Sequence, residues 1–524
     1  MAFTPDSVIH LCNVPFESDY KHQITFDTIG QQEQYFMNRR VRTVNNCTYV
    51  RKEGYIRLPY HIDSLWNCNY VMYLNNNFTN KWFYAFITRL EYVNDGVTNA
   101  YIETDVWQTW QFDITLRPSF VEREHVTDDS IGANTLDEGL AYGDYIVNAI
   151  DTPIERTADD LCYIIGCTVN PVTSSDTVGG KVYNGIYSGV TYYKADGKDA
   201  INTVIKNIEE AGKIDSITGI FMAPKDISLG ESYAAIVGLE KVNEGTNPST
   251  KFFSVNKNFD MNGYTPKNNK LKVFPYNFLR VSNNAGQSAI YPYEYFSTEQ
   301  CNFYLYETIA PGISGRLIPT NYKKEGQNYD EGLSEGKYPV CNFAVDMYTN
   351  WQTQNAVNQG FDLLMGVGTM AVGAAAALTT PVTAGVGGIA GAGMMVSGFN
   401  QIVNTLNNDR KASLVPDQVR GNTNCGDVNT SMGRNCFDFY KVSIKQEYAK
   451  IIDDFFEMYG YKVNRVKVPN IKTRPCWNYV KTVNMNLDGK APQQDLEKIK
   501  DLFNNGITFW RSSATLEDYS QNNH

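Results

Sequence analysis

Histidine is scarce in this sequence of 524 residues, and its scarcity limits the chemistry that the chain can perform. The five histidines are His10, His22, His61, His125 and His524. So few imidazoles leave little room for acid–base catalysis by histidine or for a metal site built from several histidines. No HExxH, GxSxG or Walker A sequence is present either. We therefore expect no catalytic residues, no metal and no cofactor, and we do not expect an enzyme.

Closely spaced cysteine pairs of the CxxC type are also absent. The ten cysteines are scattered from Cys12 to Cys476, so a zinc ribbon or a thioredoxin-like site is excluded. We expect isolated, reduced thiols, as in a protein made in a reducing cytosol. The first twenty residues lack a basic start and have a broken apolar run, and we therefore expect no secretory signal peptide.

Basic residues are outnumbered by acidic ones, 46 to 57, which gives a formal net charge of −11. This balance argues against a dedicated nucleic-acid binder, because such a protein needs a basic surface to displace counterions from phosphates. It does not argue against a channel through which DNA passes, because acidic walls repel phosphate.

Aromatic residues are abundant, with 35 Tyr, 26 Phe and 7 Trp, and they favour β-sheet surfaces. Residues 24–125 alternate like strands, most clearly at 84–93 and 97–103, which flank a hairpin turn at 94–96. A short helix is predicted over 105–112 because its apolar residues share one face.

The middle of the chain has a different pattern. "DLCYIIGCTV" predicts a buried strand, and residues 198–211 predict a helix between two further strands, with Gly212 as its stop. This is the pattern of a βαβ-type insert. Aromatic strands return over 271–350, strand–helix–strand follows residue 435, and a last helix is predicted over 492–503. The fold class is therefore a β-rich α+β fold with an inserted α/β domain.

Acidic pairs offer few candidates for a catalytic or calcium site. Asp453/Asp454 and Glu122/Glu124 have no sugar-binding context, and we expect solvated charges there. Asp128 and Asp129 near Asp137 and Glu138 do not have EF-hand spacing, and we expect surface acidity instead of calcium binding.

One long stretch has no charge at all. Residues 363–408, called here the apolar segment, are 46 positions without Asp, Glu, Lys, Arg or His. Pro381 divides the segment into arms of 363–380 and 382–408. At ~1.5 Å per residue, 18 helical residues reach roughly 27 Å, close to the ~30 Å hydrocarbon core of a bilayer. A helical hairpin of this length could span a membrane.

Small residues dominate the apolar segment, with nine glycines between Phe361 and Asn400. The candidate helix-packing residues are Ala384, Gly387, Gly388, Gly391 and Ala392. Such small-xxx-small faces let helices approach closely in lipid, but each interior glycine costs about 1 kcal/mol of helix stability in water. This composition favours conditional membrane insertion. A buried hairpin or loop in a soluble core and a permanent anchor remain alternatives.

Several stretches together resemble a known family. They are "FITRLEYVNDGVTNAYIETDVWQTWQFDITLRPSFVEREHV" (86–126), "KVFPYNFLRVSNNAGQ", "YPVCNFAVDMYTNWQTQN" (338–355), "EMYGYKVNRVKVPNIKTRPCWNYVKT" and "LFNNGITFWR". In this order they resemble the distal tail tube, or tail knob, proteins of Picovirinae-type short-tailed phages of Gram-positive bacteria. The apolar segment follows "NWQTQN", where that family carries its long hydrophobic loops.

The resemblance implies a ring-forming homohexamer at the distal end of the tail, in which hydrophobic loops plug the lumen and then insert into the host membrane as a pore for the genome. The inserting loops would fall on about 355–425. Their apolar contacts would be Leu363, Leu364, Val367, Met370, Leu378, Val386, Ile389, Met394, Val396 and Phe399.

The resemblance also implies an organisation and a set of partners. The expected parts are 1–130 as the start of the tail-tube domain, 131–270 as the insert, 271–350 as the β-rich continuation of the tube, 351–425 as the membrane-active loop and 426–524 as the C-terminal α+β part. The expected partners are copies of the chain, the collar or proximal tube, the tail tip, the host membrane and viral DNA that passes without specific binding. The protein would be assembled in the host cytoplasm and carried in the virion.

Two rival functions belong to other classes. A cell-wall-degrading tail-tip protein would need a catalytic centre, for which the sequence has no candidate. A receptor-binding tail protein would use 131–270 as its adhesive module, but that region has no Trp for a sugar platform.

Overall fold

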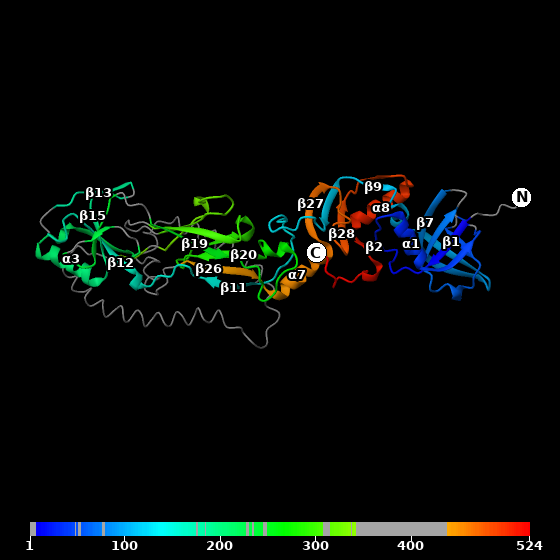
Figure 1. Cartoon of the computed structure of the whole chain (residues 1–524), viewed down its shortest axis with the longest axis horizontal. Coiled ribbons are helices and arrows are strands. Elements are labelled where there is room, and N and C mark those ends of the chain that lie inside the picture. Colours follow the sequence, from blue (N-terminus) through cyan, green and yellow to red (C-terminus); the bar gives the residue numbers. More distant parts are fainter. Residues whose placement is uncertain are drawn as a thin grey trace, which may run out of the picture. The chain divides into compact units, whose positions relative to one another are not determined.

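The computed structural model describes residues 7–47, 49–50, 54–75, 79–173, 177–183, 185–226, 230–232, 235–244, 249–307, 315–336, 338–341 and 437–524 (Figure 1). The chain divides into two compact units. The first comprises residues 1–141, 267–270 and 450–524, and the second comprises 142–266 and 271–449. The predicted ranges 131–270 and 271–350 fall mainly in the second unit, and the proposed five-part division stays a prediction.

A seven-stranded antiparallel sheet opens the first unit, in the order β3-β1-β6-β7-β8-β5-β4. Its strands are β1 (Ser7–Cys12), β3 (Arg40–Asn45), β4 (Tyr49–Val50), β5 (Tyr55–Leu58), β6 (Tyr70–Asn75), β7 (Thr79–Asn94) and β8 (Val97–Thr104). The predicted hairpin is confirmed, with Asn94 paired to Val97 across the turn. The Asn94 side chain accepts a hydrogen bond from the Gly96 N–H at 3.0 Å, which fixes the turn.

Helix α1 (Ile29–Asn38) interrupts this β-rich region, so the expectation of strands throughout 24–125 is wrong at these ten residues. Thr28 caps the helix by accepting a hydrogen bond from the Gln31 N–H at 3.3 Å. The Thr-x-x-Gln spacing is a helix-start signal, and it was present in the sequence. Phe36 of α1 is fully buried and stacks on Tyr70 of β6, with ring centroids 5.1 Å apart.

A five-stranded sheet completes the first unit, in the order β2-β30-β28-β10-β27. Its strands are β2 (His22–Ile24), β10 (Ser119–Glu124), β27 (Tyr461–Lys467), β28 (Trp477–Val483) and β30 (Ile507–Trp510), and β9 (Ile114–Leu116) pairs separately with β29 (Leu487–Gly489). Helices α2 (Val106–Trp110) and α8 (Gln493–Asn505) confirm the two predicted helices. Trp107, Phe503 and Phe509 pack together between them.

Buried carboxylates in the first unit correct the expectation of surface acidity. Glu138 forms ion pairs with Arg123 and Lys270 and accepts a hydrogen bond from the Lys462 N–H at 3.0 Å. Asp453 is fully buried, as is Glu124. A buried carboxylate needs an ion partner or hydrogen bonds, and residues distant in sequence supply them. Glu124 pairs with Lys467, and Asp453 accepts hydrogen bonds from the Lys267 and Asn268 N–H groups at 2.7 Å and 3.0 Å.

Two four-stranded sheets form one part of the second unit. The first has the order β11-β26-β20-β21 and the second has the order β19-β22-β23-β24. Their strands are β11 (Tyr145–Asp151), β19 (Ser249–Asn256), β20 (Asn277–Ser282), β21 (Ser288–Pro292), β22 (Gln300–Glu307), β23 (Arg316–Pro319), β24 (Leu333–Ser334) and β26 (Asp438–Ile444). Leu279, Phe303 and Phe439 belong to the hydrophobic core that the two sheets share. Helix α7 (Gln446–Tyr459) lies between β26 and β27 in the chain, as predicted.

A six-stranded sheet forms the other part of the second unit, in the order β17-β18-β15-β12-β16-β25. Its strands are β12 (Leu161–Cys167), β15 (Thr191–Ala195), β16 (Ile217–Pro224), β17 (Gly230–Ser232), β18 (Leu239–Val242) and β25 (Val340–Cys341), and β13 (Lys181–Tyr183) and β14 (Ile186–Ser188) form a separate hairpin. Strand β12 is antiparallel to both β15 and β16.

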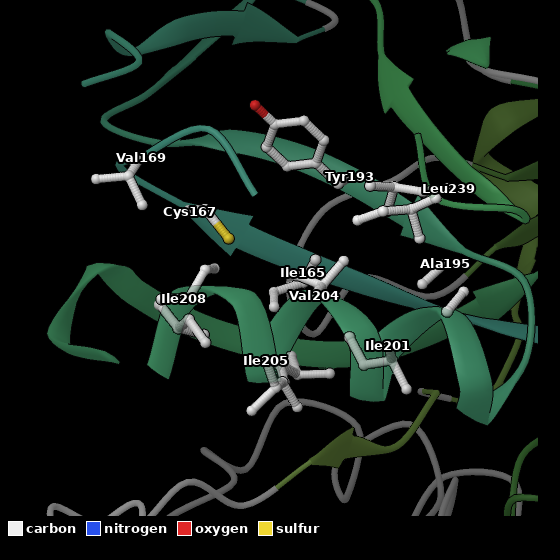
Figure 2. Packing of buried hydrophobic residues seen from close by; sticks show 14 residues of the cluster. Ile165, Cys167, Val169, Tyr193, Ala195, Ile201, Val204, Ile205, Ile208 and Leu239 are labelled. Carbon is white, nitrogen blue, oxygen red and sulfur yellow. The ribbon is translucent and has the colours of Figure 1, made fainter. Parts of the chain in front are cut away.

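Helix α3 (Lys198–Glu210) connects β15 to β16, so the predicted strand–helix–strand unit is confirmed, with β12 inserted between its two strands. The apolar face of α3 covers the sheet, and Figure 2 shows Val204 of α3 next to Ile165 of β12. Ile201 and Ile208 extend this layer along the helix. Gly212 follows the helix with a φ of +68°, a conformation that favours glycine.

The cysteines whose side chains the structure describes are free, and six of them, Cys12, Cys47, Cys68, Cys162, Cys167 and Cys301, are buried. Burial raises the pKa of Cys162 and Cys167 to about 12, so both are unreactive thiols at neutral pH. Across the described ranges, no helix combines the length and the apolar character needed to cross a membrane.

We expect Ile208→Ala to destabilise the layer between α3 and its sheet by about 2–5 kcal/mol, because it removes buried methylene groups and leaves a cavity. Hydrogen exchange of the full chain, followed by mass spectrometry over residues 161–224, measures the change. Lys206→Ala on the exposed side of the same helix is the matched control, with an expected change within about 0.5 kcal/mol. Equal exchange in the two variants would contradict the packing described.

Candidate functional site

The residues predicted to insert in a membrane, Leu363 to Phe399, lie outside the described residues, as do the small residues from Ala384 to Ala392. The described chain reaches Cys341 and begins again at Phe437. Both ends belong to the second unit. The site that the structure describes is therefore the pair of attachment points on either side of residues 342–436.

The first attachment point is β25, an edge strand of the six-stranded sheet. Its two residues pair with Ile220 and Phe221 of β16. The Met222 N–H also donates a hydrogen bond to the Pro339 carbonyl at 2.9 Å. The described chain thus reaches residue 341 on an edge strand, where an extension does not disturb any further strand pairing of the described residues.

The second attachment point is β26, an interior strand of the β11-β26-β20-β21 sheet. It pairs antiparallel with β11 on one side and with β20 on the other. Phe437, directly before the strand, and Phe439 are both buried. The Phe439 ring contacts Phe303 and Phe253, with centroids 5.2 Å and 5.6 Å apart. The described chain therefore resumes at a position fixed by two strand ladders and by core packing.

A buried ion cluster includes Glu335 and Tyr338, which precede the first attachment point by a few residues in the chain. Arg156 is at its centre, with a side chain that is 4% exposed. Its guanidinium forms an ion pair with Glu307 and a hydrogen bond to Glu335 Oε1 at 3.0 Å. The Tyr338 hydroxyl accepts from Arg156 Nη1 at 2.8 Å and donates to Glu335 Oε1 at 2.6 Å. Lys251 Nζ approaches the other oxygen of Glu307 at 3.1 Å.

Asp226 completes this cluster at its more exposed side, where it pairs with Lys251 and lies 3.8 Å from Arg156. With every group ionised, three carboxylates would face two cations. The cluster joins the chain before β12 to β19, β22 and the residues that lead into β25. It therefore holds together parts of the second unit that are far apart in sequence.

The imbalance of charge affects the protonation of the cluster. Burial raises the pKa of the Glu335 carboxyl to about 7, against the lowering effect of Arg156 and with a raising contribution from Glu307. Burial alone would lower the pKa of Arg156, but Tyr338, Glu307 and Glu335 raise it above its ordinary value, so the guanidinium stays charged. The Glu335 carboxyl therefore gains or loses a proton near neutral pH.

The arrangement of the cluster suits a structural role, in which it holds the chain in place ahead of β25. Glu335 and Tyr338 are held by Arg156, and they lie only a few residues before β25. Within the part of the chain that the structure describes, no group of three or more His, Cys, Asp or Glu residues is placed to hold a metal ion. The sequence did not indicate the cluster, because Arg156, Glu307 and Glu335 lie in separate segments with no common motif.

Comparison with known families matches most of the chain. Residues 240–524 match the family described as the C-terminal domain of the tail knob protein gp9 of Bacillus phage phi29. Residues 6–115 match the family described as the N-terminus of the caudoviral major tail protein.

Relatives match over the full length of both chains. The tail knob protein gp9 of Bacillus phage B103 is 29% identical, that of phage phi29 is 25% identical and that of phage PZA is 26% identical, each over 100% of this chain and of the relative. The solved structure of the bacteriophage C1 tail knob protein gp12 covers 98% of each chain with a TM-score of 0.65 and 17% identity. This last similarity concerns the fold.

We expect Glu335→Gln to remove a pH dependence of stability. The pKa of Glu335 is about 7 in the folded chain against an ordinary 4.5, so the folded state binds the proton more tightly. The resulting stabilisation is complete below pH 4.5 and is lost as the pH rises through 7, a change on the order of 3 kcal/mol. The glutamine stays neutral, so the variant should become more stable relative to the parent between pH 5 and pH 8.

Urea unfolding of the full chain at pH 5, 6, 7 and 8 measures this difference. Glu299→Gln, at an exposed position just before β22, is the control and should leave the pH dependence unchanged. A difference between Glu335→Gln and the parent that is constant over this range would show that Glu335 does not exchange the proton.

Proposed function

Because this chain belongs to the family of phage tail knob proteins, structural components of the virion, we propose that it forms the distal end of the tail tube and the conduit through which the genome leaves. We propose further that its hydrophobic loops plug the lumen of the tube and then insert into the host membrane as a pore. The β-rich fold is that of a tail knob protein.

The observation that carries the membrane proposal is a long uncharged sequence between two anchored strands. The apolar segment has 46 positions without a charge. It is preceded by β25 and followed by β26, both of which are paired within the second unit. Residues joined to the unit at both ends can act as a loop while the strands that hold them stay folded. Insertion would then not require the knob itself to unfold.

The proposed membrane contacts are the residues named from the sequence, Leu363, Leu364, Val367, Met370, Leu378, Val386, Ile389, Met394, Val396 and Phe399. In hydrocarbon every backbone N–H and C=O must pair internally, which favours helices in an otherwise glycine-rich segment. Gly387 and Gly391 would let such helices pack closely.

The proposed assembly is a homohexameric ring. The seven-stranded sheet of the first unit ends in the strands β3 and β4, which offer unpaired backbone groups to a neighbour. Residues 6–115, which include this sheet, are similar to a family of major tail proteins. The net charge of −11 favours a channel that DNA traverses without binding. Other proposed partners are the collar or proximal tube and the tail tip, with assembly in the host cytoplasm.

We expect the purified protein to release dye from liposomes when it is triggered by low pH or heat, and a variant that lacks 363–406 to assemble without releasing dye. A single charge introduced into the apolar segment should reduce dye release, as the deletion does. Ile389→Asp places a carboxylate in the apolar segment at a cost of about 2.5–3.5 kcal/mol at the bilayer centre, so dye release should fall sharply.

Ser397→Ala is the matched control for the charged variant and should release dye like the parent. Release by the deletion variant at the parent's rate would refute membrane insertion by this segment. Such a result would leave the structural role in the tail intact.

We expect the assembled protein to weigh about 355 kDa in multi-angle light scattering, since six chains of 59.1 kDa form the proposed ring. The measurement is made at high concentration, alone and with the neighbouring tail protein. A monomer under both conditions would rule out the hexamer.

A further inference from the structure

A row of aromatic rings lies on the outer face of the β19-β22 strand pair in the second unit. It is made by Phe252, Tyr304, Tyr306 and Tyr329 and is called here the aromatic strip. The successive ring centroids are 5.2 Å, 6.1 Å and 6.4 Å apart. Phe252 is 55% exposed and Tyr329 is 53% exposed. The rings therefore form a continuous line that is open to solvent at both ends.

Strand register explains why Phe252, Tyr304 and Tyr306 share one face, and Tyr329, which follows β23 in the chain, lies next to Tyr306. Phe252 of β19 pairs with Tyr304 of β22, and Tyr306 is two residues further along β22. Side chains alternate between the faces of a strand, and the residues of β22 on either side of Tyr304, Phe303 and Leu305, are fully buried in the core. The aromatic strip is thus the face of the sheet opposite the core, where large rings are not needed for burial.

Neutral hydrogen-bonding side chains continue the same face of the sheet. Ser254 pairs with Asn302, and Asn256 pairs with Gln300. Gln300 Nε2 donates to Asn256 Oδ1 at 3.0 Å. The face therefore combines apolar ring surfaces with amides and hydroxyl groups that carry no charge.

Charged residues near the aromatic strip are mostly engaged elsewhere. Lys251 lies on the opposite face of β19 and pairs with Glu307 and Asp226. Lys323 pairs with Glu331 close to Tyr329. Arg316, opposite Tyr306 in register, donates from Nη2 to the Tyr329 carbonyl at 2.6 Å. Lys251 and Lys323 are therefore paired with carboxylates, whereas Arg316 is held beside the rings by a backbone carbonyl.

We propose that the aromatic strip binds an uncharged polysaccharide chain of the bacterial surface. A pyranose ring presents C–H faces that pack on aromatic rings and hydroxyl edges that hydrogen-bond to amides and hydroxyl groups. Both kinds of partner are present side by side on this face. Four rings in a line suit several sugar units of a chain better than a single sugar.

Charge supports the choice of an uncharged ligand. The protein has a net charge of −11, so an anionic wall polymer would be repelled as it approached, whereas a neutral glycan would not. The inference rests on membership of a phage tail and is independent of membrane insertion. The aromatic strip lies within 252–329 and overlaps the predicted adhesive range 131–270 only at Phe252.

Co-sedimentation of the full chain with Gram-positive cell walls tests the proposal. The walls are used intact and after hydrofluoric acid has removed their phosphate polymers, and soluble chitohexaose is the competitor. We expect the protein to sediment with the stripped walls. Phe252→Ala and Tyr304→Ala should each weaken retention about three- to tenfold, and together they should abolish it.

Tyr187→Ala is the matched control, because Tyr187 is an equally large ring of the second unit, 71% exposed on β14, and lies outside the aromatic strip. It should be retained like the parent. Phe252→Trp should also be retained, because a ring is kept. Hydrogen exchange over residues 249–307 verifies that each variant is folded.

Three outcomes would overturn the proposal. The parent could fail to sediment with stripped walls, binding could require the phosphate polymers, or the alanine variants could sediment like the parent. If the alanine variants changed only the mass of the assembly, the strip would be an interface between copies of the chain, and the glycan proposal would be wrong.

Discussion

The pairing of β26 with strands that precede it by more than a hundred residues is the constraint on which the second unit depends. Strand β26 lies between β11 and β20, so neither side of that sheet is complete until the chain beyond residue 436 has returned. The closure spans 95 residues, 342–436. The entropy of closing a loop grows only with the logarithm of its length, about 0.6 kcal/mol per doubling. A long segment can therefore be carried between β25 and β26 without a large cost to the fold.

The ends of this span are secured in two different ways. At β26 the hold is geometric, because two strand ladders and the buried rings of Phe437 and Phe439 fix one position. Before β25 the hold is electrostatic, because Arg156 binds Glu335 and Tyr338. Removal of one partner from such a buried cluster leaves a charge unpaired in the interior, which is strongly destabilising. The cluster thus fixes the positions of Glu335 and Tyr338 shortly before β25.

The proposed contacts with a host use two separate chemistries. The apolar segment suits hydrocarbon, since it has no charge over 46 positions. The aromatic strip suits sugar, since amides and hydroxyl groups continue its face of a sheet whose other face is core. Successive side chains of a strand point to opposite faces of its sheet. The same short sequence can therefore stabilise the fold on the core face and present a binding surface on the outer face.

The sequence by itself determined the local elements. The hairpin of β7 and β8, helices α3 and α8, and the uncharged segment follow from periodicity, turn residues and composition, all of which act within a few residues. The missed helix α1 also had a local signal, the Thr28 cap. Only the tertiary structure decided that β12 lies between β15 and β16, that Glu138 and Asp453 are buried, and that Arg156 meets Glu307 and Glu335. Strand neighbours and ion partners are selected by contacts between residues that are distant in the sequence. A periodic pattern predicts which face of an element is apolar, but it does not predict which other element covers that face.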